Sequence, residues 1–216
     1  MVDANPPENP SQATRQHWNK LHQLRPPSEL SWYAEQPRDS MAMLDSLQMD
    51  DVGISVIDVG GGISRFVDAL LRRGYSDVGV LDVSSAALAL SRDRVGAERT
   101  VHWIEANVLT WLPPRQYDLW HDRAVFHFLT TSDDRASYRK VLSRALAPTG
   151  HAIIGAFAPQ GPATCSGLPV ARYSVEQLAA EFEGLLDVTT VHAGDHITPN
   201  GIAQPFSWIA GRRSPR

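Results

Sequence analysis

The 216-residue sequence has a single cysteine, Cys165, and no large excess of charge of either sign. One cysteine excludes a disulfide bond within the chain and suits a reducing compartment such as the cytoplasm. A formal net charge of −4 gives no sign of the basic surface that binds nucleic acid or an anionic membrane. We therefore expect a cytoplasmic protein that binds neither nucleic acid nor a membrane.

Long hydrophobic runs are also missing. No apolar stretch is long enough to span a bilayer, and the first residues lack the basic and apolar regions of a secretory signal. Hydrophobic residues make up 43% of the sequence and charged residues 20%, which is typical of a soluble globular protein. The length fits one α/β domain with a full core.

The N-terminal quarter differs from the rest of the sequence. Residues 1–12 are rich in proline, asparagine and glutamate, and we expect a disordered tail there. Residues 13–50 are expected to form a separate helical segment, with short helices near 12–24 and 41–47. Between them, Trp32 and Tyr33 stand in a loop flanked by prolines.

From residue 51 to 216 the sequence reads as one domain in which strand-like and helix-like segments alternate. Strands are expected near 53–59, 77–82, 100–105, 117–122, 151–157, 186–192 and 204–210. Helices are expected near 64–73, from Ser84 or Ser85 to Gly96, around Tyr138 to Leu146, and after Ser174. This alternation predicts an α/β fold, a doubly wound and mostly parallel Rossmann-like sheet with helices on both faces. The last two strands have no helix between them, which favours an antiparallel pair.

A triple glycine carries the strongest functional signal. It follows an apolar run that ends at Asp58, and an amphipathic helical pattern begins directly after Gly60, Gly61 and Gly62. A strand, tight glycine loop and helix N-terminus in this order bring the backbone close to a nucleotide-like ligand. Asp82 ends the next apolar run, twenty residues after Gly62, where a carboxylate can accept hydrogen bonds from ribose hydroxyls.

Two classes of nucleotide ligand use such a loop. A dinucleotide site has the pattern G-x-G-x-x-G, but Arg65 stands at the third glycine position, where a long side chain would obstruct helix packing. An acidic residue two positions before the first glycine also suits a ligand with a cationic end better than a pyrophosphate. The pattern of Asp58 to Gly62, with Asp82, resembles motif I and its partner in class I S-adenosylmethionine-dependent methyltransferases. A nicotinamide-dependent oxidoreductase is the disfavoured alternative.

This resemblance implies S-adenosylmethionine as cofactor and a seven-stranded sheet with an antiparallel C-terminal strand. It places Asp58 and the three glycines against the amino-acid end of the cofactor and Asp82 on the ribose. Asn107 stands where the family often has an acidic residue near the adenine, and a plain turn residue is the alternative there. The remaining cofactor contacts that we expect are Val83, Val108 and Asp122.

The segment from Trp120 to Leu129 borders the expected site, because ligands lie at the carboxyl ends of the strands in such sheets. It resembles the corresponding segment of thiopurine and thiol methyltransferases and of some protein-lysine methyltransferases. His121 and His127 are candidates for a general base, with a buried structural histidine as the alternative for each. Asp122 and Arg123 could form an internal ion pair.

The residues expected to contact the methyl acceptor lie outside the glycine loop: Trp32, Tyr33, Phe126 and Cys165, with His196 a weaker candidate. We assign no metal. The function that the sequence favours is methyl transfer from S-adenosylmethionine to a small molecule by in-line displacement, under an N-terminal segment that closes over the site. A protein-lysine methyltransferase and an inactive cofactor-binding module remain as alternatives. The acceptor and the oligomeric state stay undetermined.

Overall fold

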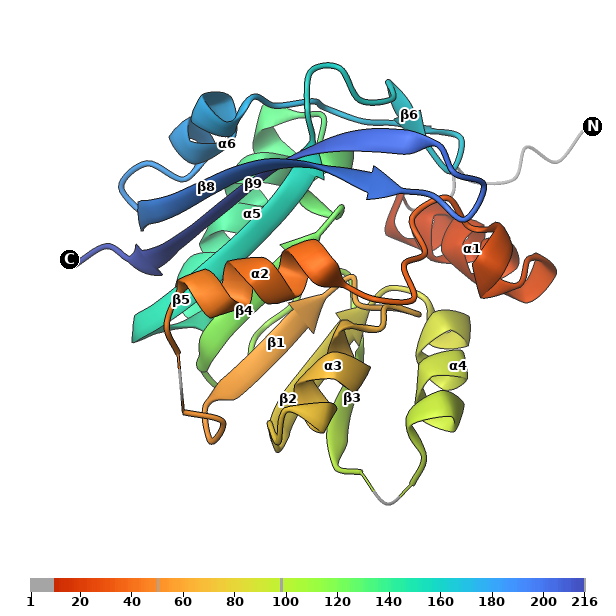
Figure 1. Ribbon diagram of the computed structural model, residues 1–216, viewed down its shortest axis with the longest axis horizontal. Helices are drawn as coiled ribbons and strands as arrows, with labels where there is room; N and C mark the ends of the chain where they lie inside the picture. The colour runs from red at the N-terminus through yellow and green to blue at the C-terminus, as the bar shows by residue number, and fades with distance from the viewer. Residues whose placement is uncertain (1–9, 50, 98, 216) are drawn as a thin grey trace, which may run out of the picture.

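A seven-stranded sheet forms the centre of the molecule, with the strand order β3-β2-β1-β4-β5-β9-β8 (Figure 1). The computed structural model describes residues 10–49, 51–97 and 99–215. The strands are β1 (Ser55–Val59), β2 (Asp77–Asp82), β3 (Val101–Glu105), β4 (Tyr117–Arg123), β5 (Leu146–Phe157), β8 (Leu186–Ile197) and β9 (Ala203–Arg213). Strands β1 to β5 run parallel, and β9 lies antiparallel between β5 and β8. The predicted fold class, including the antiparallel C-terminal strand, is confirmed.

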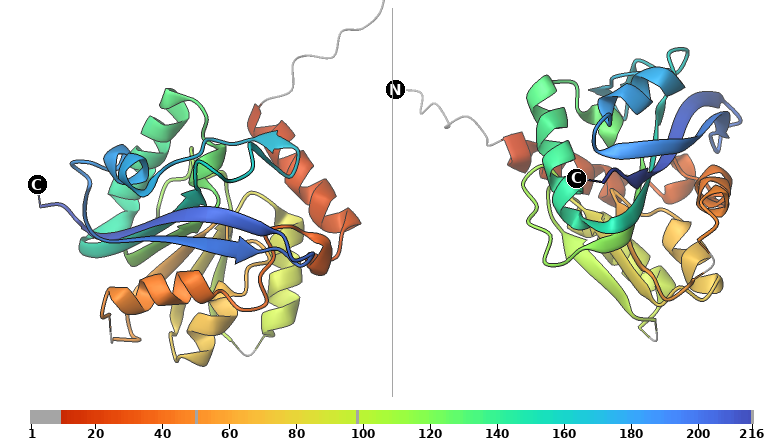
Figure 2. Two further views of the ribbon diagram at one scale, coloured as in Figure 1. Left: turned by 45° about the horizontal axis from the view of Figure 1, so that its top comes forward. Right: turned by 90° about the vertical axis from the view of Figure 1, so that its left-hand side faces the viewer.

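Helices cover both faces of the sheet, as Figure 2 shows from two further directions. They are α1 (Pro10–Leu24), α2 (Arg38–Ser46), α3 (Phe66–Arg72), α4 (Ser85–Val95), α5 (Ser132–Ala145) and α6 (Val175–Glu181). Short 3-10 turns, η1 (Pro27–Glu29) and η2 (Phe126–Phe128), and a small hairpin of β6 (Thr164–Cys165) and β7 (Leu168–Pro169) complete the chain. None of the helices in the described part of the chain has the length and apolar composition to cross a membrane.

Two hydrophobic clusters form the core, one on each face. Alternate residues of a strand point to opposite faces, so Val56 packs with α2, α3 and α4 while Ile57 packs with α5 and α6. The same alternation on β4 sends His121 and Arg123 to the α2 face and Asp122 to the α5 face. Side chains of neighbouring strands can therefore meet at the strand ends only when they point to the same face of the sheet.

Several predicted boundaries differ from the observed ones. Helix α1 starts at Pro10, so residues 10–12 of the expected disordered tail are helical, whereas residues 1–9 of that tail lie outside the described residues. Strand β5 starts at Leu146 instead of residue 151 and pairs with β4 across a register shift. Strand β8 continues to Ile197, five residues beyond the prediction. Its last residues are mostly exposed and hold their conformation by pairing with β9, so no buried pattern marks them.

The N-terminal elements lie at two places on the sheet (Figure 1). Helix α2 lies on one face of the sheet, where it contacts β5, β8 and β9. Helix α1 lies at the edge of the sheet where the parallel strands end, and it contacts α4. The turn of the β8–β9 hairpin, residues 198–202, reaches the same edge. The carboxyl ends of the strands are thus bordered by α1, the loop that follows it and this hairpin turn.

Candidate active site

The glycine loop that follows β1 requires glycine at several positions. Gly60 and Gly62 have positive φ angles of 64° and 34°, which side chains disfavour. A Cβ atom on Gly60 would stand 2.0 Å from a methyl carbon of Val125, from the segment after β4. The backbone N–H of Gly60 donates to the carbonyl of Leu81 over 2.7 Å, which ties the loop to β2.

Asp58 lies beneath this loop with one carboxylate oxygen unused. The residue is 1% exposed, and its Oδ1 is 2.7 Å from Nδ1 of His121. Its Oδ2 has no hydrogen-bond partner among the described residues. A Cβ atom on Gly61 would stand 2.5 Å from that oxygen. A buried, unpaired carboxylate oxygen facing a bare backbone fits a ligand that brings an N–H donor, such as an ammonium group.

His121 holds Asp58 in this position. Besides its contact with Asp58, its Nε2 is 2.9 Å from the hydroxyl of Ser40 in α2. The ring stacks on Phe66 with centroids 3.9 Å apart. Because both ring nitrogens have partners and the residue is buried, this geometry does not support the general-base prediction for His121. It fits the alternative of a buried structural histidine.

Asp82 stands at the end of β2 beside the same loop. Its Oδ1 accepts a hydrogen bond of 2.8 Å from the backbone N–H of Ser84, and the N–H groups of Gly62 and Val83 also point to it. Burial raises the pKa of Asp82 to about 7, and the nearby charge of Asp58 adds to the rise. A Cβ atom on Gly62 would stand 2.8 Å from Oδ2. The two carboxylates therefore flank one stretch of bare backbone.

The residues expected near the adenine lie after β3. The side-chain oxygen of Asn107 accepts a hydrogen bond of 2.9 Å from the N–H of Leu109, which is a turn arrangement. This favours the turn alternative for Asn107, although its place beside the end of β2 is as expected, since Ala106 donates to the carbonyl of Asp82. Val108 is buried in the cluster on the α5 face.

Asp122 has a different place from the one predicted. It is completely buried on the α5 face, where it accepts hydrogen bonds from the N–H groups of Val125 and Phe126 and from the hydroxyl of Tyr138. Burial raises its pKa to about 7. The predicted cofactor contact and the ion pair with Arg123 do not fit this arrangement, because adjacent strand residues point to opposite faces. Asp122 instead fixes the turn that ends β4.

Phe126 was expected to contact the acceptor, but it also points into the α5 face. Its ring packs on Tyr138, Tyr173 and Phe182, and the residue is fully buried. The 3-10 turn η2 sends Phe128 to the other side, where its ring meets Trp18 of α1 at 5.3 Å. The aromatic side chain near the strand ends is therefore that of Phe128, which the sequence analysis did not predict as a site residue.

His127 is buried and has no hydrogen bond to either ring nitrogen among the described residues. It lies between the rings of Phe128 and Phe157, at 4.5 and 4.6 Å. Desolvation lowers its pKa to about 3, and the positive charge of Arg123 adds to the shift. The ring is thus neutral at physiological pH, with one nitrogen able to donate and the other able to accept a hydrogen bond.

Four segments far apart in the chain meet around Arg123. Its guanidinium donates to the carbonyl of Trp32, and its positive charge acts on His127, His196 and Cys165. Burial lowers the pKa of both histidines and raises the pKa of the Cys165 thiol. His196 donates from Nε2 to the carbonyl of Ser31 over 2.8 Å, and Cys165 is buried. We call Trp32, Arg123, His127, Cys165 and His196 the Arg123 cluster. Trp32, Cys165 and His196 thus lie close to Arg123 and stay candidates for contact with the acceptor.

Tyr33 belongs to the glycine-loop side instead. Its ring packs against the small cluster of Leu30, Ile63 and Ala87, and its hydroxyl accepts a hydrogen bond from Arg65 over 3.1 Å. Arg65 precedes α3 and points outward to Tyr33, Glu35 and Asp68. Trp32 packs against the same small cluster, but the hydroxyl of Tyr33 bonds to Arg65 beside the glycine loop, which does not support its predicted contact with the acceptor.

Helix α1 packs next to the glycine-loop side and next to the Arg123 cluster. The side-chain oxygen of Asn19 accepts hydrogen bonds from the hydroxyl of Ser84 and the N–H of Ala86, at 2.8 and 3.2 Å, at the start of α4. Trp18 meets Trp32 at 5.7 Å. Asn19 and Ser40 were not identified from the sequence, because their partners stand 65 and 81 residues away and no local pattern marks such contacts.

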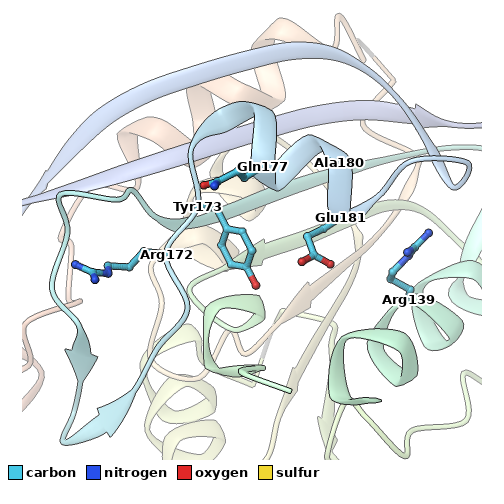
Figure 3. A pocket seen from close by; sticks show the side chains of 6 residues that line it. All are labelled: Arg139, Arg172, Tyr173, Gln177, Ala180 and Glu181. Carbon is cyan, nitrogen blue, oxygen red and sulfur yellow. The ribbon is translucent and has the colours of Figure 1, made fainter. Parts of the chain in front are cut away.

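A separate surface hollow of about 390 Å³ lies between α5, α6 and the segment before α6 (Figure 3). Figure 3 shows the side chains of Tyr173 and Glu181 pointing into it. The six residues that line it include none of the predicted site residues. It is therefore distinct from the arrangement at the strand ends.

Comparisons with known proteins agree with this geometry. Residues 56–150 match the family model described as a methyltransferase domain, which spans the glycine loop, Asp82 and the end of β4. Among curated proteins, none matches the sequence.

Solved structures share the fold over nearly the whole chain. Burkholderia thailandensis 1,6-didemethyltoxoflavin-N1-methyltransferase, with bound 1,6-didemethyltoxoflavin and S-adenosylhomocysteine, has a TM-score of 0.72 at 17% identity, over 99% of this chain and 93% of that chain. An S-adenosylmethionine-dependent methyltransferase from Anabaena variabilis has a TM-score of 0.71 at 15% identity, over 99% of both chains. The N-methyltransferase NodS from Bradyrhizobium japonicum, in complex with S-adenosylhomocysteine, has a TM-score of 0.62 at 17% identity, over 83% of this chain and 89% of that chain.

At these identities the structural likeness establishes the fold, and the family match adds the class. Residues 56–150 are thus similar to the methyltransferase-domain family, and the chain as a whole has the fold of S-adenosylmethionine-dependent methyltransferases.

Proposed function

We propose that this protein transfers a methyl group from S-adenosylmethionine to a small molecule by in-line displacement. The single observation that carries the donor site is the unpaired Oδ2 of Asp58 against the bare backbone of Gly61. In this proposal Asp58 and the glycine loop hold the ammonium end of the donor. Asp82 accepts from the ribose hydroxyls, with the N–H of Val83 helping to fix its carboxylate. Asn107 and Val108 border the adenine.

The donor brings an already activated methyl group on a sulfonium, so the protein's own contribution is alignment and exclusion of water. Fixed near-attack geometry can contribute about 7–11 kcal/mol to lowering the barrier. Within residues 13–50, helix α1 and the loop after it would act as a lid, with Asn19 attached to α4 and Trp18 packed against Trp32 and Phe128. Helix α2 lies on the sheet face and takes no part in this cover. This cover favours a small acceptor over a folded protein, whose lysine would have to pass beneath α1. The Burkholderia enzyme with the same fold also methylates a small molecule.

His127 is the group that we propose contacts the acceptor. With a pKa of about 3 the ring is a weak base, so its role in this proposal is to accept a hydrogen bond from the nucleophile and orient it. His121 is left as a positioning residue, because both of its nitrogens are engaged. Phe128 replaces Phe126 as the aromatic contact.

The experiment incubates the purified protein with radiolabelled S-adenosylmethionine and a lysate separated into small-molecule and protein fractions. We expect label in the small-molecule fraction, with loss of transfer in Asp82→Ala. Label only in the protein fraction would replace this proposal with the protein-methylating alternative. No transfer to either fraction, with intact donor binding, would favour the inactive binding module.

A further inference from the structure

Arg123 is a cation without a counter-ion in direct contact. Among the described residues no carboxylate lies within ion-pair distance of it, and its one hydrogen bond goes to the backbone of Trp32. The carboxylates that act on it from farther away are Asp58 and Asp39. Asp58 is already bonded to His121, and Asp39 lies 4.0 Å from His192 on the surface. The charge is therefore not neutralised by a partner of its own.

The surroundings of Arg123 make this charge costly. Desolvation lowers its pKa, and the neighbouring Cys165 is buried among apolar residues. The titratable neighbours supply no negative charge. Burial lowers the pKa of His127 and His196, which are therefore neutral rings, and raises the pKa of the Cys165 thiol, which therefore stays protonated. Because Arg123 is half-buried, its charge is only partly solvated, and a ligand that brings an anion would stabilise it.

The ring of His127 gives a second, independent sign of a ligand. Both nitrogens are buried and lack partners among the described residues, although buried polar groups are normally hydrogen-bonded. The ring stands beside Arg123 at the carboxyl end of β4, where ligands lie in this fold.

The backbone between these two residues is also held in a strained shape. Ala124 has a φ of 70°, which non-glycine residues rarely adopt. Asp122 holds this turn through the N–H groups of Val125 and Phe126. The chain thus maintains a costly turn that sets Arg123 and His127 on the same side.

We propose that the methyl acceptor is an anion and that Arg123 binds its negatively charged group, with His127 hydrogen-bonded beside it. The inference rests on the proposed function and names the acceptor's chemical class, a small acidic molecule flat enough to lie against Trp32 and Phe128. A planar guanidinium pairs with a carboxylate or a similar oxyanion through two parallel hydrogen bonds, which a neutral acceptor cannot reproduce.

The test uses matched aromatic probes on the protein loaded with S-adenosylhomocysteine. Calorimetry measures the binding of 2-naphthoate and of 2-naphthamide, which share a shape and differ in charge. We expect naphthoate to bind at least about tenfold more tightly than naphthamide. Arg123→Met should remove this preference and leave the affinities for naphthamide and S-adenosylhomocysteine unchanged, while Arg123→Lys should keep part of it. Equal affinities in the unmutated protein, no binding of naphthoate at millimolar concentration, or a preference that persists in Arg123→Met would each overturn the proposal.

Thermal unfolding without probe separates a ligand-binding arginine from a structural one. Arg94 is the matched control, because it is half-buried and fully engaged with Asp68 and the carbonyls of Ile63 and Ser64. We expect Arg94→Met to lower the midpoint and Arg123→Met to leave it unchanged or raise it. An equal fall in both variants would make Arg123 structural and overturn the inference. Failure to bind S-adenosylhomocysteine would instead refute the proposed function.

Discussion

The two halves of the strand-end edge are built in different ways. On the half that we propose holds the donor, at the ends of β1, β2 and β3, Asp58, Asp82 and the three glycines stand within short sequence signatures. On the half that we propose holds the acceptor, the Arg123 cluster draws its members from residues 32, 123, 127, 165 and 196. The donor half is organised by backbone turns next to strands, and the acceptor half by packing between distant segments.

This difference explains why the sequence predicts the class of reaction but does not identify the substrate. A glycine loop and a carboxylate at a strand end recur wherever the same donor must be held. The acceptor half has no such repeating geometry, since loops and lid segments there vary while the sheet stays the same. The charges differ as well: the donor half presents carboxylates, and the acceptor half presents an arginine beside neutral histidines.

The largest expected effect concerns His121, which stands on β4 but serves the donor half. His121→Ala would leave the buried carboxylate of Asp58 without its partner, and removal of one member of a buried pair typically costs about 3–5 kcal/mol. We expect a clear loss in the free energy of unfolding, measured by urea denaturation. The control is His102→Ala, which breaks a solvent-exposed pair with Asp77 and should change little. Similar losses of unfolding free energy in both variants would contradict the claim that His121 stabilises the buried carboxylate of Asp58.

The next largest effect concerns Asp82 and tests the donor half alone. Asp82→Ala should weaken the binding of S-adenosylhomocysteine by about 10- to 100-fold, since hydrogen bonds to a charged group contribute about 1.5–3 kcal/mol. Calorimetry gives the dissociation constant. Asp77→Ala is the control, because Asp77 begins the same strand and pairs with Arg115 far from the loop. An unchanged dissociation constant in Asp82→Ala would exclude this carboxylate from the donor site.

The fold was far more predictable than the site. Strand β2 has the predicted bounds, and a helix follows Ser174 as predicted. The pattern of a strand and the capping box of Ser174 and Gln177 both depend on neighbouring residues. Strand β8 was predicted too short because cross-strand pairing holds its exposed end. Phe126 was predicted to contact the acceptor, and Phe128 was not considered, because the sequence does not show where the 3-10 turn begins and hence which way each side chain points. Asp122 and Arg123 were paired because they are adjacent, although strand geometry separates them.

A pH effect of intermediate size should appear on the donor half alone. The pKa of Asp82 is raised to about 7, so its carboxylate is mostly protonated at pH 6 and mostly ionised at pH 8. Binding of S-adenosylhomocysteine should therefore strengthen by about tenfold over that interval. The histidine of the acceptor half, His127, has a pKa of about 3 and should not titrate there. Asp82→Asn should flatten the profile, and a profile unchanged by this substitution would contradict the assignment.

The same raised pKa values have the opposite effect on stability. Asp82 and Asp122 bind protons more strongly in the folded than in the unfolded chain, so their contribution to stability falls as pH rises from about 4 to 7. Asp122→Asn is the control in the binding experiment, since it changes this stability profile and should leave the pH dependence of donor binding in place.

The smallest expected effect concerns the lid that covers both halves. Asn19→Ala removes the acceptor for the N–H of Ala86 at the start of α4, and loss of such a cap costs about 0.5–2 kcal/mol. We expect S-adenosylhomocysteine to dissociate several-fold faster, measured by stopped-flow fluorescence. Arg15→Ala is the control, since its pair with Glu105 is exposed. An unchanged rate in Asn19→Ala would mean that α1 does not close over the donor.

The most direct test of the account compares two ligands on the same protein by calorimetry. The account predicts that S-adenosylhomocysteine binds at one site per chain and that oxidised nicotinamide adenine dinucleotide gives no heat of binding. Tight binding of the dinucleotide, with none for S-adenosylhomocysteine, would contradict the central claim that the glycine loop between Asp58 and Asp82 holds a methyl donor.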